Sequence, residues 1–145
     1  MRRILPGLVV IAIGLTTLPA PADAGRTEAG QAADRFAQVL CTGDTAAIRS
    51  ILPDSGKILV SIPDTGLDAG YFGRSQVETL LADYLAAFSF RQCRIDHLEV
   101  DPASYARIDL TAVRGGDAGG EIMFRLALQV EQGRWVAREI RESTR

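Results

Sequence analysis

The chain has 145 residues, a formal net charge of −2 and a hydrophobic share of 47%. This length suits one domain with a packed core, and the slightly acidic balance excludes the basic surface typical of nucleic-acid binders. After the first 24 residues, no stretch is long and apolar enough to span a membrane.

The N-terminus has the three-part layout of a secretory signal peptide. Arg2-Arg3 precedes an apolar run from Ile4 to Leu18, and Ala22-Asp23-Ala24 is a small-x-small cleavage signal. A membrane anchor is the alternative, but the run is shorter than the roughly 20 residues that a spanning helix needs. We therefore expect residues 1–24 to be removed and residues 25–145 to form a periplasmic or extracellular domain.

Two cysteines, Cys41 and Cys93, remain in a chain that is bound for an oxidising compartment. A disulfide between them is expected there. Closing a loop of this length stabilises a fold by roughly 4 kcal/mol in the chain-entropy model. The alternative is a pair of buried free thiols, which are common in protein cores.

Two helices are predicted at the start of the mature chain. Apolar residues recur at spacings of three and four and predict a helix over about 27–42, with Gly43 as its C-terminal cap. Asp44 is placed to cap a second, short helix, which Pro53 ends.

A hairpin and a third helix follow. The alternating stretch KILVSIP (57–63) predicts a strand, Asp64 to Gly66 a turn, and residues 69–72 a short return strand. Ser75 to Glu78 matches the S-x-x-E capping box. The apolar residues after it form one helical stripe: Val77, Leu80, Leu81, Tyr84, Leu85 and Phe88. A phosphate-binding loop would need a glycine-rich turn ending in lysine, which this segment lacks.

The remaining residues alternate with period two. They predict strands near 91–100, 104–114, 120–131 and 134–142. Alternation of apolar and polar residues indicates an antiparallel sheet with one covered face. The glycine-rich segment 115–120 lies between two strands, so we interpret it as a hairpin loop and not as a dinucleotide fingerprint. Gln132-Gly133 is a tight turn. The predicted fold is α+β, with three N-terminal helices packed on a curved antiparallel sheet.

Three segments carry a resemblance to the NTF2-like (cystatin-like) superfamily, whose cone-shaped fold is shared by SnoaL-like cyclases and ketosteroid isomerase. They are LCTGDTAAIRSIL (40–52), GYFGRSQVETLLADYL (70–85) and QGRWVAREI (132–140). The segment 93–97 also resembles the apolar-x-aliphatic-x-His pattern of a branch of small secreted bacterial NTF2-like domains of unknown function. The resemblance covers nearly all of the mature chain.

The resemblance implies a cavity between the concave sheet face and the helices. We expect its lining to include Phe36, Leu40, Tyr84, Phe88, His97, Phe124 and Trp135. The alternative is that these side chains fill the space. Many domains of this superfamily dimerise through the outer sheet face, but here that face is expected to be polar and to favour a monomer or a weak homodimer. Its expected residues are Arg107, Asp109, Thr111, Arg125, Gln129 and Glu131.

His97 is the single histidine, and no H-x-x-x-H or C-x-x-C spacing is present, so we expect neither a metal nor a cofactor. If Cys93 points to the concave face, strand alternation puts His97 there too, as a candidate general acid or base. Leu98 and Val100 would then point outward, unless a β-bulge switches the faces. The alternative is an exposed or structurally bonded histidine.

An isomerase-type site would need a carboxylate near a hydrogen-bond donor such as Tyr84. None of the candidates Asp83, Asp109 and Glu139 is clearly placed to pair with it. We therefore expect non-enzymatic binding of a small apolar ligand or a protein partner, without nucleic acid or a membrane anchor. An isomerase or cyclase that uses a cavity tyrosine or histidine with a carboxylate is the alternative.

Overall fold

A computed structural model of the chain describes residues 21–63, 69–101, 104–116 and 119–144. The elements in chain order are α1 (Pro21–Thr42), the 3₁₀ helix η1 (Thr45–Ile51), β1 (Ile58–Ser61), β2 (Gly70–Phe72), α2 (Arg74–Ala87), β3 (Phe90–Asp101), β4 (Tyr105–Arg114), β5 (Gly120–Glu131) and β6 (Arg134–Thr144). All three predicted helices are confirmed, and the predicted strands match within one or two residues at each end. The predicted turn at 64–66 lies outside the described residues.

The strands form one six-stranded curved sheet in the order β2-β1-β6-β5-β4-β3. The four long strands pair antiparallel, as predicted. One pair differs, because β1 pairs in parallel with β6, with Val60 opposite Ile140, so the sheet is mixed and not purely antiparallel. The β1–β2 hairpin therefore extends the main sheet. Alternation along a strand reports which face is covered, but it carries no information about which distant strand lies alongside.

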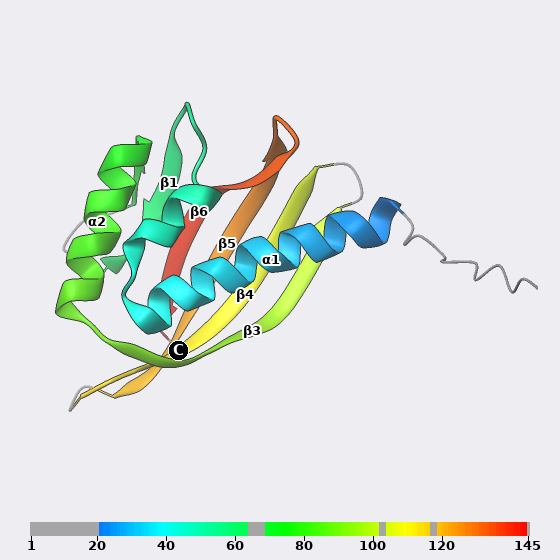
Figure 1. Ribbon diagram of the computed structural model, residues 1–145. Coiled ribbons are helices and arrows are strands. Elements are labelled where there is room, and N and C mark those ends of the chain that lie inside the picture. Colours follow the sequence, from blue (N-terminus) through cyan, green and yellow to red (C-terminus); the bar gives the residue numbers. More distant parts are fainter. Residues whose placement is uncertain (1–20, 64–68, 102–103, 117–118, 145) are drawn as a thin grey trace, which may run out of the picture.

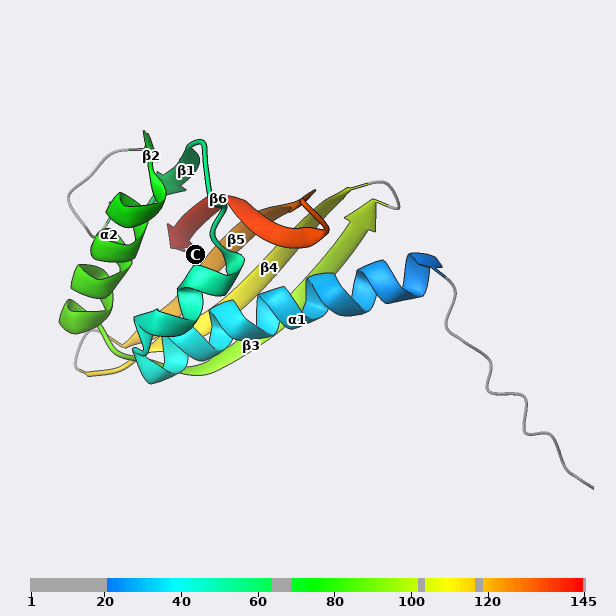
Figure 2. The ribbon, with the colours of Figure 1, turned by 45° about the horizontal axis from the view of Figure 1, so that its top comes forward.

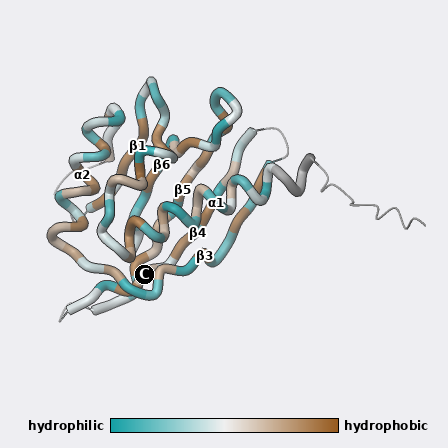
Figure 3. The backbone as a smooth tube through the Cα atoms, in the orientation of Figure 1, coloured by the Kyte–Doolittle hydropathy of each residue, from teal (hydrophilic) through white to brown (hydrophobic). Residues whose placement is uncertain are grey.

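All three helices cover the same, concave face of the sheet (Figures 1 and 2). α1 runs across β3 and β4, whereas α2 lies on the side of β1. Hydrophobic positions recur along the helices and along the strands (Figure 3), and buried residues of both form one hydrophobic core. The structure thus confirms the α+β class with helices on one face.

Local signals in the sequence account for several element ends. Gly43 has φ of 71°, and its N–H donates to the Val39 carbonyl at 2.9 Å, which closes α1. Asp44 accepts from the Ala46 N–H at 3.1 Å and caps η1. Gln132 and Gly133, which connect β5 to β6, both have positive φ, as the type I′ turn of a two-residue hairpin requires.

The start of α2 differs from the prediction. The helix begins at Arg74, so Gln76 and not Glu78 is its third residue. Gln76 Oε1 accepts from the Gly73 N–H at 2.8 Å and satisfies that donor. Glu78 instead bonds the Arg49 guanidinium at 3.1 Å and ties α2 to η1. The S-x-x-E match at Ser75 is therefore two residues out of register with the observed N-cap, Gly73.

A disulfide joins Cys41, at the end of α1, to Cys93 on β3, with 6.0 Å between the Cα atoms. Two register shifts interrupt the pairing of β3 with β4, one of them between Ile95 and His97. The second shift switches the faces, so that Ile95 and Leu98 both pack against the core. The predicted bulge is confirmed, and it turns the His97 side chain outward.

The outer face of the sheet is covered by its own ion pairs. Arg107 bonds Glu99 at 2.8 Å, and Arg125 bonds Asp109 at 2.8 Å. Thr111, expected on this wet face, is only 2% exposed, because the Asp96 carboxylate covers it and accepts its hydroxyl hydrogen. The side chains beside Thr111 on the adjacent strands are longer than its own, and they cover it.

Candidate functional site

A buried hydrogen bond joins the end of α2 to the end of β6. The Tyr84 hydroxyl donates to Glu142 Oε2 at 2.7 Å. Tyr84 is 2% exposed and the Glu142 side chain 1%. A buried carboxylate carries a large desolvation cost, so its retention in a core marks this position as a candidate site.

Arg114, at the end of β4, supplies the compensating charge. Its Nη2 lies 3.7 Å from Glu142 Oε1, and its side chain is 13% exposed. The guanidinium carbon lies 4.2 Å from the centroid of the Phe88 ring, a cation–π distance. Three elements that are distant in sequence thus place one donor, one carboxylate and one cation together.

Aromatic rings surround the cluster. The Tyr84 ring centroid lies 5.4 Å from that of Phe88, 5.6 Å from Phe90 and 6.4 Å from Phe124. Phe124 in turn lies 6.1 Å from Phe36 and 5.8 Å from Phe90. These are the spacings of rings in direct contact. The aromatic cluster therefore occupies the space between the helices and the sheet at this end of the fold.

The surroundings hold Tyr84 in its neutral form. Burial raises the pKa of the Tyr84 hydroxyl well above its ordinary value, and the hydrogen bond to Glu142 and its negative charge add to this, whereas Arg114 opposes it. Tyr84 is consequently a hydrogen-bond donor at physiological pH and not a base. Glu142 is the acceptor, and with a 1% exposed side chain it is enclosed by the cluster.

Glu142 was not predicted as a site residue from the sequence, although the alternation of side chains along its strand indicates that it faces the core. Ile140 is fully buried, and Glu142 stands two residues further along the same strand. Glu139 was considered instead because it shares parity with Trp135. The β5–β6 register shifts after Ala127 reverse that parity, so Glu139 lies on the outer face and pairs with Arg141. A bulge inside a strand cannot be located from alternation alone.

The other residues expected to line a cavity lie apart from this cluster. Leu40 is 2% exposed and belongs to the core beneath α1. Trp135 is near the start of β6, seven residues from Glu142, and therefore at the opposite end of that strand. The His97 side chain is 57% exposed, with Nε2 4.0 Å from Glu99 Oε2. That position places His97 at the surface and removes it as a cavity acid or base.

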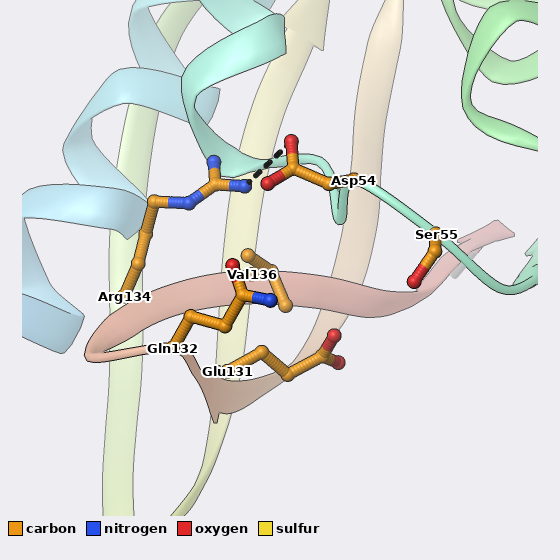
Figure 4. Close-up of a pocket in the computed structure, with 6 residues that line it drawn as sticks. All are labelled: Asp54, Ser55, Glu131, Gln132, Arg134 and Val136. Atoms are coloured by element: carbon orange, nitrogen blue, oxygen red, sulfur yellow. Dashed lines mark ion pairs between the residues drawn. The ribbon is translucent and has the colours of Figure 1, made fainter.

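Two hollows lie beside the β5–β6 turn. In the first, Arg134 bonds the carbonyls of Ser50 and Leu52 and pairs with Asp54 at 3.3 Å (Figure 4). Its volume of about 20 Å³ holds roughly one water molecule, so this is a structural clamp on the exit of η1.

The second hollow is a groove of about 240 Å³ between α1 and the turn. Its walls are Glu28, Gln31, Ala32, Arg35, Gly133, Arg134 and Trp135. Within the described ranges, no three His, Cys, Asp or Glu side chains are grouped so that they could hold a metal ion. Among the described residues, no helix has the length and hydropathy to cross a bilayer.

Comparison with known proteins identifies the fold. No family model and no curated protein matches the sequence. Among solved structures, a DUF4783 family protein from Bacteroides uniformis superposes with a TM-score of 0.65 at 12% identity, covering 77% of this chain and 95% of that one. A proposed dehydratase of the NTF2-like family from Streptomyces avermitilis gives 0.66 at 17% identity, covering 85% and 98%.

An LEH-like epoxide hydrolase from M. tuberculosis gives a TM-score of 0.59 at 20% identity and covers 81% of this chain and 82% of its own. At these identities the likeness establishes the fold alone. The chain has the NTF2-like fold, as the resemblance of its three sequence segments implied.

Proposed function

We propose that the chain is an exported NTF2-like domain that works by binding a protein partner and not by catalysis. The observation that carries this proposal is the aromatic cluster around Tyr84, whose rings are in contact with one another. A small apolar ligand would have to displace those rings. Binding at the surface requires no such displacement, so a protein partner is favoured over a small apolar ligand.

Export rests on the N-terminal signal and is supported by the disulfide, which suits an oxidising compartment. Cleavage after Ala24 is compatible with the fold, because Ala29 is the first fully buried residue among those of α1 from Gly25 onward. N-terminal sequencing of the protein from periplasmic and medium fractions tests this step. A mature chain that starts at Gly25 is expected, and an intact Met1 in both fractions would contradict export by this signal.

Native mass spectrometry of the mature protein, purified from the periplasm without refolding, tests the choice of partner. The proposal predicts the bare mass of the chain, less two hydrogens for the disulfide. A retained small molecule would overturn this proposal and would support a ligand-binding cavity instead.

A second candidate function is acid–base catalysis of the isomerase or cyclase kind. It is favoured by one observation, the Tyr84–Glu142 hydrogen bond in aromatic surroundings, which supplies a donor and a carboxylate together. Two of the similar structures are a proposed dehydratase and an epoxide hydrolase. Hydration of a panel of small epoxides by the wild type, Glu142→Gln and the surface control Glu99→Gln tests it. Turnover that only Glu142→Gln abolishes would establish this candidate.

A further inference from the structure

We infer that the groove between α1 and the β5–β6 turn is the docking site for an extended peptide segment of the partner, with an apolar side chain flanked by opposite charges. This inference rests on the proposed function and names the surface that would perform it. The α1 wall is one stripe of the helix, since Glu28, Gln31, Ala32 and Arg35 stand at spacings of three, one and three.

The floor of the groove includes two almost fully buried apolar side chains, Ala32 and Trp135. Trp135 lines it and is only 7% exposed, so its ring is held by the core. Outside the lining of the groove, Val130 is directly opposite Trp135 in the sheet and is 37% exposed. Gly133 adds no side chain, and a Cβ there would meet open space. Tryptophan is one of the residue types enriched among the side chains that contribute most to binding at protein interfaces.

The rim of the groove carries two charges that have no partner within the described residues, Glu28 and Arg35. Arg35 is one of three arginines in the described ranges without an ion pair, since the other nine of the twelve form one. The two charges are seven residues apart on α1, about 10 Å along the helix axis. The groove thus has one acidic end, one basic end and an apolar centre.

These dimensions favour a peptide over a cofactor or metabolite. A volume of about 240 Å³ is below the roughly 300–1,000 Å³ of small-molecule pockets and suits one or two side chains. In an extended peptide, side chains i, i+2 and i+4 share a face over about 13 Å. A basic, an apolar and an acidic residue at those positions would meet Glu28, Trp135 and Arg35 in turn.

The chain contains a built-in reporter, because Trp135 is its single tryptophan. Its fluorescence is followed while two capped peptides are titrated into the mature protein, Lys-Gly-Leu-Gly-Asp and Lys-Gly-Leu-Gly-Lys. The wild type is expected to bind the first more tightly. Arg35→Glu is expected to weaken the first peptide by roughly fivefold to tenfold and to favour the second, because one attraction becomes a repulsion.

Arg26→Glu is the matched control, since Arg26 is an exposed arginine of the same helix, lies outside the groove and has no ion pair with any other described residue. It should bind both peptides as the wild type does. Equal affinities for both peptides in wild type and Arg35→Glu, or no saturable change up to millimolar peptide, would overturn the inference. A dimer that Arg35→Glu dissociates would also overturn it, by assigning the groove to a second copy. A bare native mass together with no response to peptide would exclude the groove as the docking site and leave the proposed function unchanged. A retained small molecule would contradict the proposed function itself.

Discussion

The Tyr84 hydroxyl donates a 2.7 Å hydrogen bond to Glu142, which joins the last turn of α2 to the end of the last strand in the core. The pair spans 58 residues of sequence and holds one wall of the helical layer against the sheet. Arg114 and the aromatic rings complete its surroundings, so the stability of this end of the fold depends on it.

Tyr84→Phe should destabilise the fold by about 1–3 kcal/mol, because it leaves a buried carboxylate without its donor. The hydroxyl is the only group removed, so packing of the ring is kept. Urea unfolding of the mature protein measures the effect. Tyr71→Phe is the control, since Tyr71 is 71% exposed, and it should change stability by less than about 0.5 kcal/mol. Equal effects of the two substitutions would show that the buried bond contributes nothing.

The raised pKa of Tyr84 predicts a loss of stability in alkaline solution. The unfolded chain releases the phenol proton near pH 10, whereas the folded chain retains it, so the stabilising contribution is complete below pH 10 and is lost as the pH rises further. The free energy of unfolding should fall between pH 9.5 and 11, and Tyr84→Phe should fall less steeply. Parallel slopes for the two proteins would contradict the assignment.

The lowered pKa of Glu78 predicts a loss of stability in acidic solution. Its hydrogen bonds to Arg49 and Arg74 lower its pKa in the folded state, so its contribution is present above the unfolded pKa and is lost as the pH falls through the folded one. Glu78→Gln should therefore lose less stability than the wild type between pH 5 and pH 3. Unfolding curves across this range check it, with Glu28→Gln, whose carboxylate has no ion pair among the described residues, as control.

The Cys41–Cys93 disulfide closes a separation of 52 residues. Its replacement by two serines should cost about 2–4 kcal/mol, since the unfolded chain regains conformational freedom. Thermal unfolding with and without dithiothreitol measures this. The reductant should lower the Tm of the wild type and leave the variant unchanged. A wild-type Tm that is insensitive to full reduction would remove the disulfide from the stability of the fold.

His97→Ala should be nearly silent, within about 0.5 kcal/mol, because the side chain is 57% exposed and lies on the outer face. Peptide binding in the groove should also be unchanged. Loss of peptide binding in this variant, with the fold intact by circular dichroism, would indicate a functional role for His97.

The sequence predicted most of the fold because its signals are local. Alternation placed β3 to β6, and Gly43 and Asp44 marked the break between the first two helices. The parallel pairing of β1 with β6 depends on a contact between residues about 80 apart, which no local pattern encodes. The N-cap of α2 at Gly73 was not predicted because two overlapping capping patterns competed, and the helix uses the one with glutamine.

For the candidate site, the sequence supplied Tyr84 and the phenylalanines but not their acidic partner. Glu142 can be recognised as a buried residue only when the alternation of side chains is followed through the bulge in β6. Arg114 can be recognised as its neighbour only when the structure places the end of β4 beside α2. The pairing of the cysteines was expected from the compartment. The unpaired charges of the groove needed the structure, because an arginine shows its lack of a partner only after every other side chain is placed.

Xenon derivatisation of crystals of the mature protein tests the central claim most directly, since xenon enters apolar cavities in protein interiors. We expect no xenon within the aromatic cluster of Tyr84, Phe90 and Phe124, because those rings already contact one another. A well-occupied xenon site among them would show open space beside Tyr84 and Glu142, and would contradict a binding function confined to the surface.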